Sequence, residues 1–127
     1  MNKEFVTYEQ ALALKELGFD EPCFAVYYDT KEFKTYTGVW VKFNSEFNGK
    51  GVMSAPLYQQ AFRWFREKHG YGCYVKGRKA MGFDYTLTDV PTTKAKNDIL
   101  FSEHVYDTYE EAELACLDKL IEICKNK

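Results

Sequence analysis

The sequence lacks the patterns that mark several common classes of protein. None of its four cysteines belongs to a C-x-x-C pair, and no apolar run approaches the length that spans a membrane. The first residues, Met-Asn-Lys-Glu-Phe, lack the apolar core of a signal peptide. We therefore expect reduced cysteines, no membrane association and a cytoplasmic location.

Signatures of catalytic and metal sites are also scarce. Histidine occurs twice, and the closest His and Cys, His69 and Cys73, lie four residues apart near a predicted helix end. A nucleophilic Cys–His pair needs a third group to orient it, and a zinc site needs two further ligands, such as Cys23 or His104. The glycines at residues 49 and 51 are not followed by the Gly-Lys-Ser/Thr ending of a phosphate-binding loop. We expect no catalytic residue, no metal and no cofactor.

Aromatic residues, in contrast, are abundant, and charge is unevenly distributed. Ten Tyr, ten Phe and two Trp should supply much of the buried area. The formal net charge is −2, but residues 55–83 carry six Lys and Arg against one Glu, whereas residues 84–127 carry five Lys against ten acidic residues. This pattern indicates either internal complementarity or a polarised surface. The length of 127 residues predicts a single domain, residues 1–127.

Two helices are predicted from their capping signals. Thr7 and Gln10 have the spacing of a capping box, which predicts a helix at residues 8–17 that ends at Gly18. A second capping box at residues 108–111 predicts a helix that runs to about residue 125. Acidic residues in its first turn and Lys near its end match the helix dipole.

The central helix is predicted at residues 56–69. Pro56 suits a first helical turn and Gly70 a position just past a helix end. Its apolar residues recur at three-and-four spacing and form one broad face: Leu57, Tyr58, Ala61, Phe62, Trp64 and Phe65. We expect this face to be buried as the centre of the fold.

Strand formers predict two hairpins and a fifth strand. The first hairpin joins residues 22–29 and 34–43, the second joins residues 71–76 and 81–88, and residues 99–106 predict the fifth strand. Residues 81–88 alternate apolar and polar, which is typical of a half-buried strand. The prediction is an α+β fold of order α-ββ-α-ββ(β)-α, with an antiparallel sheet of four or five strands and helices mainly on one face. The three helix starts are alike and about fifty residues apart, which suggests either an internal duplication or shared capping chemistry.

The basic and aromatic stretch at residues 63–79 is the candidate binding site. Single-stranded nucleic acid is typically held by cations that follow the phosphates and aromatic rings that stack on the bases. The candidate nucleic-acid-binding residues are Arg63, Arg66, Tyr74, Lys76, Arg78 and Lys79. In the alternative interpretation, Trp64 and Phe65 belong to the core and the cations form a solvated helix face and hairpin tip.

Three segments resemble, in the same order, a family of small hypothetical proteins from phages, prophages and metagenomes associated with Bacteroidetes. They are TYEQALALKELGFDEPC at residues 7–23, APLYQQAFRWFREK at residues 55–68 and YEEAELACLDKLIEI at residues 109–123. The resemblance implies a phage or mobile-element origin and action in the cytosol of a bacterial host. It implies no activity and no site residues.

These observations together favour a non-enzymatic accessory protein of phage origin that binds a host or phage macromolecule, for example in counter-defence. The first alternative is a single-stranded nucleic-acid-binding protein that uses residues 63–79. Further alternatives are a small nucleotide-ligand binder built as a homodimer, and a virion component.

Overall fold

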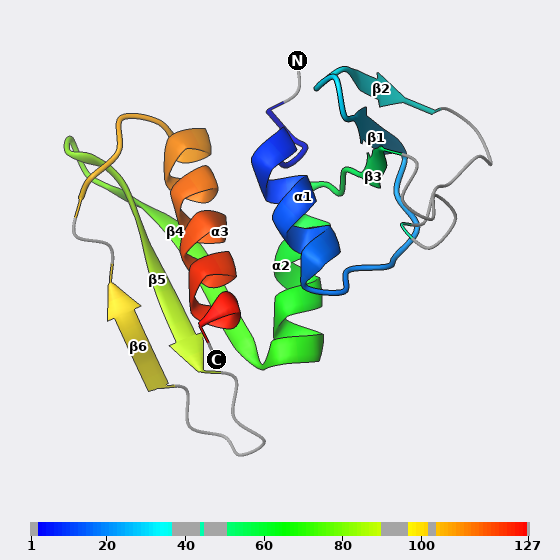
Figure 1. Cartoon of the computed structure of the whole chain (residues 1–127). Helices are drawn as coiled ribbons and strands as arrows, with labels where there is room; N and C mark the ends of the chain where they lie inside the picture. The colour runs from blue at the N-terminus through cyan, green and yellow to red at the C-terminus, as the bar shows by residue number, and fades with distance from the viewer. Residues whose placement is uncertain (1–2, 37–43, 45–50, 90–96, 102–103, 127) are drawn as a thin grey trace. The chain divides into compact units, whose positions relative to one another are not determined.

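The computed structural model describes residues 3–36, 44, 51–89, 97–101 and 104–126, with backbone only for residues 89 and 97–101. These residues form an α+β fold with three α-helices, one π-helical turn and two antiparallel sheets (Figure 1). The chain divides into two compact units, Met1–Tyr58 and Gln59–Lys127. The prediction that residues 1–127 form a single domain stays a prediction.

The first unit contains one helix and one three-stranded sheet. Its elements are α1 (Tyr8–Glu16), β1 (Ala25–Tyr28), β2 (Phe33–Thr35) and β3 (Val52–Ser54). The predicted capping box is confirmed, because the Gln10 N–H donates to Thr7 Oγ1 over 3.2 Å and the Thr7 N–H donates to Gln10 Oε1 over 3.0 Å. At the other end, Gly18 has a φ of 96° and the Phe19 N–H donates to the Leu14 carbonyl.

β1 is the central strand of the first sheet, with the order β2-β1-β3, and both pairings are antiparallel. The predicted first hairpin is confirmed for β1 and β2, while residues 37–43 of its second strand lie outside the described part of the chain. β3 was not predicted, because three residues are too short to show alternation. The buried Tyr27 hydroxyl, on the central strand, donates to the Val6 carbonyl over 2.8 Å.

The central helix is shorter and less regular than predicted. α2 (Tyr58–Trp64) continues as a π-helical turn, η2 (Phe65–His69), and Gly70 ends it in the left-handed conformation with a φ of 73°. The predicted burial of the aromatic face is confirmed for Trp64, which is 4% exposed, and for the fully buried Phe65, whereas Leu57 and Phe62 on the same face are half-buried. Arg63 and Arg66 point to solvent.

The second unit contains a three-stranded meander and a long helix. Its strands are β4 (Tyr71–Arg78), β5 (Gly82–Asp89) and β6 (Asn97–Phe101), and its helix is α3 (Tyr109–Lys125). The predicted second hairpin and last helix are confirmed, and the Glu111 N–H donates to Thr108 Oγ1 at the helix start. α3 lies across one face of the sheet and contacts β4 and β5 (Figure 1). Its buried side chains are Ala112, Glu113, Cys116, Leu117, Leu120, Ile121 and Cys124.

The prediction of a single sheet with four or five strands was wrong, because the described strands form two sheets of three strands each. Each of the first two helices is followed by three described strands, and these form two separate sheets. In the first sheet the central strand is β1, the first of its three strands in sequence. In the second sheet the central strand is β5, the second of its three strands in sequence. The internal duplication therefore remains a prediction, since the two units share an order of elements but differ in strand order.

A substitution of Gly82, at the start of β5, would test the packing of the second hairpin. Its φ is +114°, and a Cβ at this position would collide with the Tyr106 carbonyl oxygen and with Val105 Cγ1. We expect Gly82→Ala to lower the free energy of unfolding by about 2 kcal/mol or more, because strain and a backbone clash add. Urea unfolding followed by circular dichroism measures the change.

Gly77→Ala is the matched control in the same hairpin. A Cβ there would make an ordinary contact of 3.5 Å with Phe83 Cε1, and Gly77 has no positive φ. Its stability should stay within about 1 kcal/mol of the wild type. Equal losses for the two variants would contradict the described geometry of Gly82.

Candidate nucleic-acid interface

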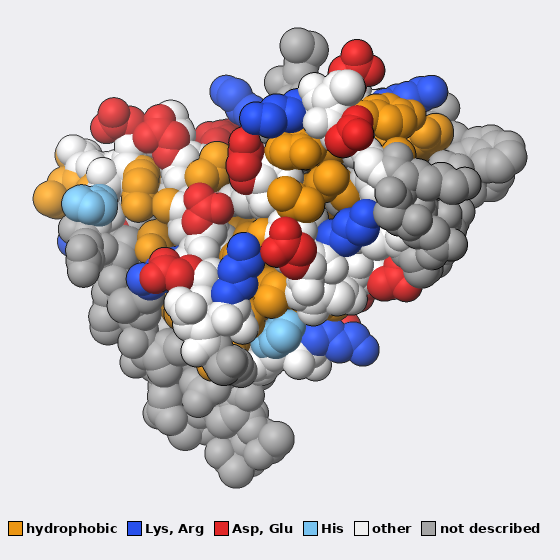
Figure 2. All heavy atoms as spheres, in the orientation of Figure 1, with side chains coloured by type: hydrophobic (Ala, Val, Ile, Leu, Met, Phe, Trp, Pro, Cys, Tyr) orange, Lys and Arg blue, Asp and Glu red, His pale blue; other side chains and the backbone are white. Residues whose placement is uncertain are grey.

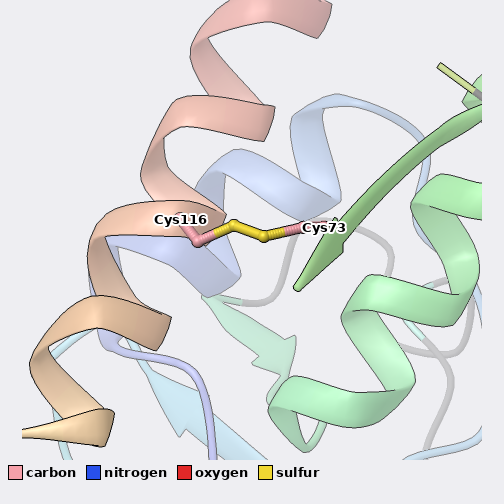
Figure 3. Close-up of a disulfide and its surroundings, with 2 residues drawn as sticks. All are labelled: Cys73 and Cys116. Carbon is pink, nitrogen blue, oxygen red and sulfur yellow. A yellow bond between two sulfur atoms is a disulfide. The ribbon is translucent and has the colours of Figure 1, made fainter. Parts of the chain in front are cut away.

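A disulfide between Cys73 on β4 and Cys116 on α3 fixes which face of β4 points toward the helix (Figure 3). Successive side chains of a strand point to opposite faces of its sheet. Cys73, Val75 and Gly77 therefore lie on the face toward α3. Every second residue of β4, beginning with Tyr74, lies on the other face.

This other face carries an aromatic residue and two cations on β4, beside a strip of polar residues on β5. We call it the outer face and define it by Tyr74, Lys76 and Arg78 on β4 with Asp84, Thr86 and Thr88 on β5. The register pairs Tyr74 with Thr86 and Lys76 with Asp84. Tyr74 is 45% exposed and both cations are exposed, whereas the three β5 residues are buried.

Arg78 and Asp84 form an ion pair across the two strands, between Arg78 Nε and Asp84 Oδ2. The carboxylate side chain is 7% exposed and the Arg78 side chain is 49% exposed. The buried carboxylate is thus balanced by a cation that still reaches solvent. Within the described part of the chain, Lys76 takes part in no ion pair, so its charge on this face is not neutralised.

The structure brings only some of the predicted site residues together. Tyr74, Lys76 and Arg78 lie together on the outer face, and Lys79 follows in the turn between β4 and β5. Arg63 on α2 and Arg66 on η2 are exposed on the preceding helix, outside this face. Whether these six residues bind nucleic acid remains a prediction.

The side of the sheet that carries α3 has a different charge. Figure 2 views the molecule from this side, where acidic side chains are spread along the helix among hydrophobic ones. The exposed acidic residues of α3 are Glu110, Glu111, Asp118 and Glu122. A polyanion would be repelled from α3 and attracted by the net charge of +1 that Lys76 and Arg78 leave on the outer face beside Asp84. The two faces of the second sheet therefore differ in electrostatic character.

The pair of His69 and Cys73 does not form a nucleophilic site in this structure. Cys73 is bonded to Cys116, and the His69 ring lies against Trp64 and Phe65, with centroids 4.9 and 5.5 Å apart. His104 is exposed and its ring contacts Tyr106. Among the described residues, no three His, Cys, Asp or Glu side chains are grouped as metal ligands would be.

We expected reduced cysteines, whereas the structure joins Cys73 and Cys116 in a disulfide. They are 43 residues apart in sequence, and only the packing of α3 on the sheet brings them together. Cys23 and Cys124 are free and buried. Burial raises the pKa of the Cys23 thiol to about 12, with a further contribution from the charge of Glu21, so this thiol is a poor nucleophile.

The prediction that residues 81–88 form a strand with one buried and one exposed face was also wrong in part. Tyr85 and Leu87 are buried toward α3, as expected, but Asp84, Thr86 and Thr88 on the opposite side are buried as well. β5 is the central strand, so neighbours flank it on both edges. Sequence reasoning missed this polar strip as a candidate site. The available signal was the regular spacing of Asp84, Thr86 and Thr88 beside a basic strand.

Comparisons with protein-family models, with curated proteins and with solved structures gave no match. Across the part of the chain that the structure describes, no helix is both long and apolar enough to cross a membrane.

Because of the disulfide, we expect the free energy of unfolding to depend on the redox conditions. By loop-closure entropy, a bond that joins residues 43 positions apart should add about 4 kcal/mol to the free energy of unfolding. We expect a reductant to lower the urea midpoint, and the protein unfolded without reductant to expose two reactive thiols out of four. A thiol assay and urea titrations measure both quantities.

A variant with Cys73→Ser and Cys116→Ser is the control. Its urea midpoint should not respond to the reductant. Four reactive thiols in the unreduced, unfolded wild type would contradict the disulfide.

Glu113 predicts a pH-dependent stability. It lies on the buried face of α3, and desolvation, followed by the charge of Glu110, raises its pKa from 4.5 to about 7. The folded state then holds a proton that the unfolded state releases, so Glu113 lowers stability progressively as the pH rises from about 4.5 to 7. We expect Glu113→Gln to raise the melting temperature at pH 8 and to leave it unchanged at pH 4.

Glu122→Gln, an exposed position on the same helix, is the control and should not show this pH-dependent gain. Melting curves from pH 4 to 8 compare the three proteins. A gain for Glu113→Gln that is equal at both pH limits would contradict the raised pKa.

Proposed function

We propose that this chain is a non-enzymatic binding protein whose second unit holds single-stranded nucleic acid on the outer face of the β4–β5–β6 sheet. The observation that carries the proposal is the alternation of Tyr74, Lys76 and Arg78 along β4, which sets one aromatic ring and two cations on one exposed strand face.

The chemistry of this face supports a single strand as the ligand. Cations attract the phosphates, and an exposed aromatic ring offers a stacking surface that a base can use only when it is unpaired. The cations are roughly two strand residues apart, about 7 Å, which is close to the spacing of successive phosphates in an extended strand. A duplex would hide its base faces from Tyr74.

The resemblance of the three helix segments supports an accessory role of phage origin in the cytosol of a bacterial host. On this proposal the protein acts by occupying exposed single strands, which are intermediates of replication, repair and defence. It needs no catalytic residue, metal or cofactor for this function.

A protein partner is the second candidate and rests on a different observation. Exposed apolar side chains gather at the start of β5, where Val105 lies against Gly82 and the Tyr109 ring contacts Phe83. Met81, the residue before β5, is 65% exposed. Such side chains favour a protein contact over a nucleic-acid contact.

Single substitutions on β4 test the proposal. We expect Tyr74→Ala to weaken binding of a labelled single-stranded 12-mer at low salt by about 1–3 kcal/mol, because base stacking is lost. Lys76→Ala should weaken it and should lower the slope of log affinity against log salt by about 0.7, the value for one phosphate contact on a single strand. Fluorescence anisotropy between 50 and 200 mM salt measures both.

Lys119→Ala removes the same charge from α3, on the opposite side of the sheet, and is the matched control. It should change neither the affinity nor the salt slope. The proposal fails if the wild type does not bind at 50 mM salt, or if Lys119→Ala weakens binding as much as Lys76→Ala does.

A further inference from the structure

β4 forms one edge of the second sheet. The strand order is β4-β5-β6, and among the described residues β4 pairs only with β5, so the outward row of backbone groups at residues 74–78 has no strand partner. Gly77 is exposed, and because it has no side chain, this exposure belongs to the backbone. Tyr74, Lys76 and Arg78 beside it are exposed as well. The backbone of this edge is therefore accessible to another strand.

β4 lacks most of the features that keep edge strands from pairing. Such strands are commonly short, interrupted by proline or bent by a bulge. β4 is eight residues long, contains no proline and keeps a regular register with β5 over all eight pairs. Its cations are the one protective feature, because like charges directly opposite each other destabilise a pair of strands. A strand that pairs here must not place a cation across from Lys76 or Arg78.

A second copy of β4 meets this condition in one antiparallel register. With a two-fold axis at Val75, each Val75 faces its counterpart, and each Tyr74 faces Lys76 of the second copy. An ammonium group over an aromatic ring is attracted by it, so this register adds two favourable contacts. An axis at Lys76 would instead set two ammonium groups opposite each other. An axis at Tyr74 would lose both contacts between ring and cation.

We propose that two copies of this chain pair through β4, with the two-fold axis at Val75, and join their three-stranded sheets into one sheet. Residues opposite each other in an antiparallel pair point to the same face. Both α3 helices therefore lie on one side of the joined sheet, and the two outer faces are continuous on the other side (Figure 1).

Each copy then supplies Tyr74 and Lys76 to one shared surface. A single strand that crosses the joint would meet cations and rings of both copies, and this part of the inference rests on the proposed function. A bound polyanion would also offset the repulsion between the cations of the two copies, so it should strengthen the dimer. The pairing of the strands itself needs no nucleic acid.

Disulfide trapping with Val75→Cys tests the pairing. In the proposed register the two new thiols are direct strand partners, with Cβ atoms about 5 Å apart, close to the spacing that a disulfide needs. The natural cysteines do not compete, since Cys73 is bonded to Cys116 and the other two are buried. We expect mild oxidation to give a covalent dimer, detected by non-reducing electrophoresis and located by peptide mass spectrometry.

Lys79→Cys, in the exposed turn of the same hairpin, is the matched control. In the proposed register position 79 lies across from position 71, so the two new thiols are eight residues, or roughly 26 Å, apart. Cross-links that form by random collision would favour this variant, because Lys79 is exposed and Val75 is half-buried. We expect Val75→Cys to cross-link at least about tenfold faster.

Sedimentation velocity without nucleic acid measures the association itself. We expect a wild-type dimer and, for Val75→Lys, a dissociation constant that is about fivefold higher or more, because two like charges then meet at the axis. An equimolar mixture of Val75→Lys and Val75→Glu should regain the dimer, since opposite charges meet there. A variant that merely fails to fold would not be rescued in this way.

A monomeric wild type without a Val75→Cys cross-link overturns the inference and leaves the proposed function standing, because one copy already carries Tyr74, Lys76 and Arg78. A wild-type dimer in which Val75→Cys cross-links no faster than Lys79→Cys also overturns it, since the copies then meet through another surface. A trapped dimer that binds no single strand supports the pairing and contradicts the proposed function.

Discussion

The packing of α3 on one face of the second sheet is the constraint on which the candidate site depends. Side chains of a strand alternate between two faces, so fixing one of them fixes all. Cys73 is that residue, because its bond to Cys116 requires it to face the helix. A shift of one residue in register would move Cys73 outward and place Tyr74, Lys76 and Arg78 against the apolar side of α3. The hydrophobic contacts of Leu87 and Leu117, both fully buried, oppose such a shift.

The outer face combines features that stability alone would not select. A buried carboxylate next to a buried hydroxyl destabilises a fold when either atom stays unpaired, and an apolar pair in their place would avoid that penalty. Arg78 relieves the problem at one carboxylate oxygen and not at the other. Lys76 lies across from Asp84 and attracts its carboxylate electrostatically, although the two form no ion pair among the described residues.

The sequence predicted best what is determined locally. Thr7 with Gln10, Gly18, Gly70 and Thr108 act within a few residues of themselves, and each occupies the helix end that its chemistry indicated. The burial of Trp64 and Phe65 followed from helical spacing. These features needed no knowledge of distant segments.

Features that depend on distant segments could not be predicted in the same way. The pairing of β3 with β1, the division into two sheets and the bond from Cys73 to Cys116 each join parts that no sequence pattern connects. For the candidate site, Tyr74, Lys76 and Arg78 repeat every second residue, a strand period, whereas Arg63 and Arg66 follow a helical period. Sorting the cations by period would have separated the sheet residues from the helix residues.

The different strand orders of the two sheets have a consequence for how the chain folds. β4, β5 and β6 pair with their neighbours in sequence, and β4 and β5 are joined by a turn at residues 79–81. β3 must instead find β1 across 23 intervening residues. Contacts between close segments lose less chain entropy when they form, so they can form earlier. The meander that carries the outer face can therefore assemble from local encounters, before the first sheet gains its third strand.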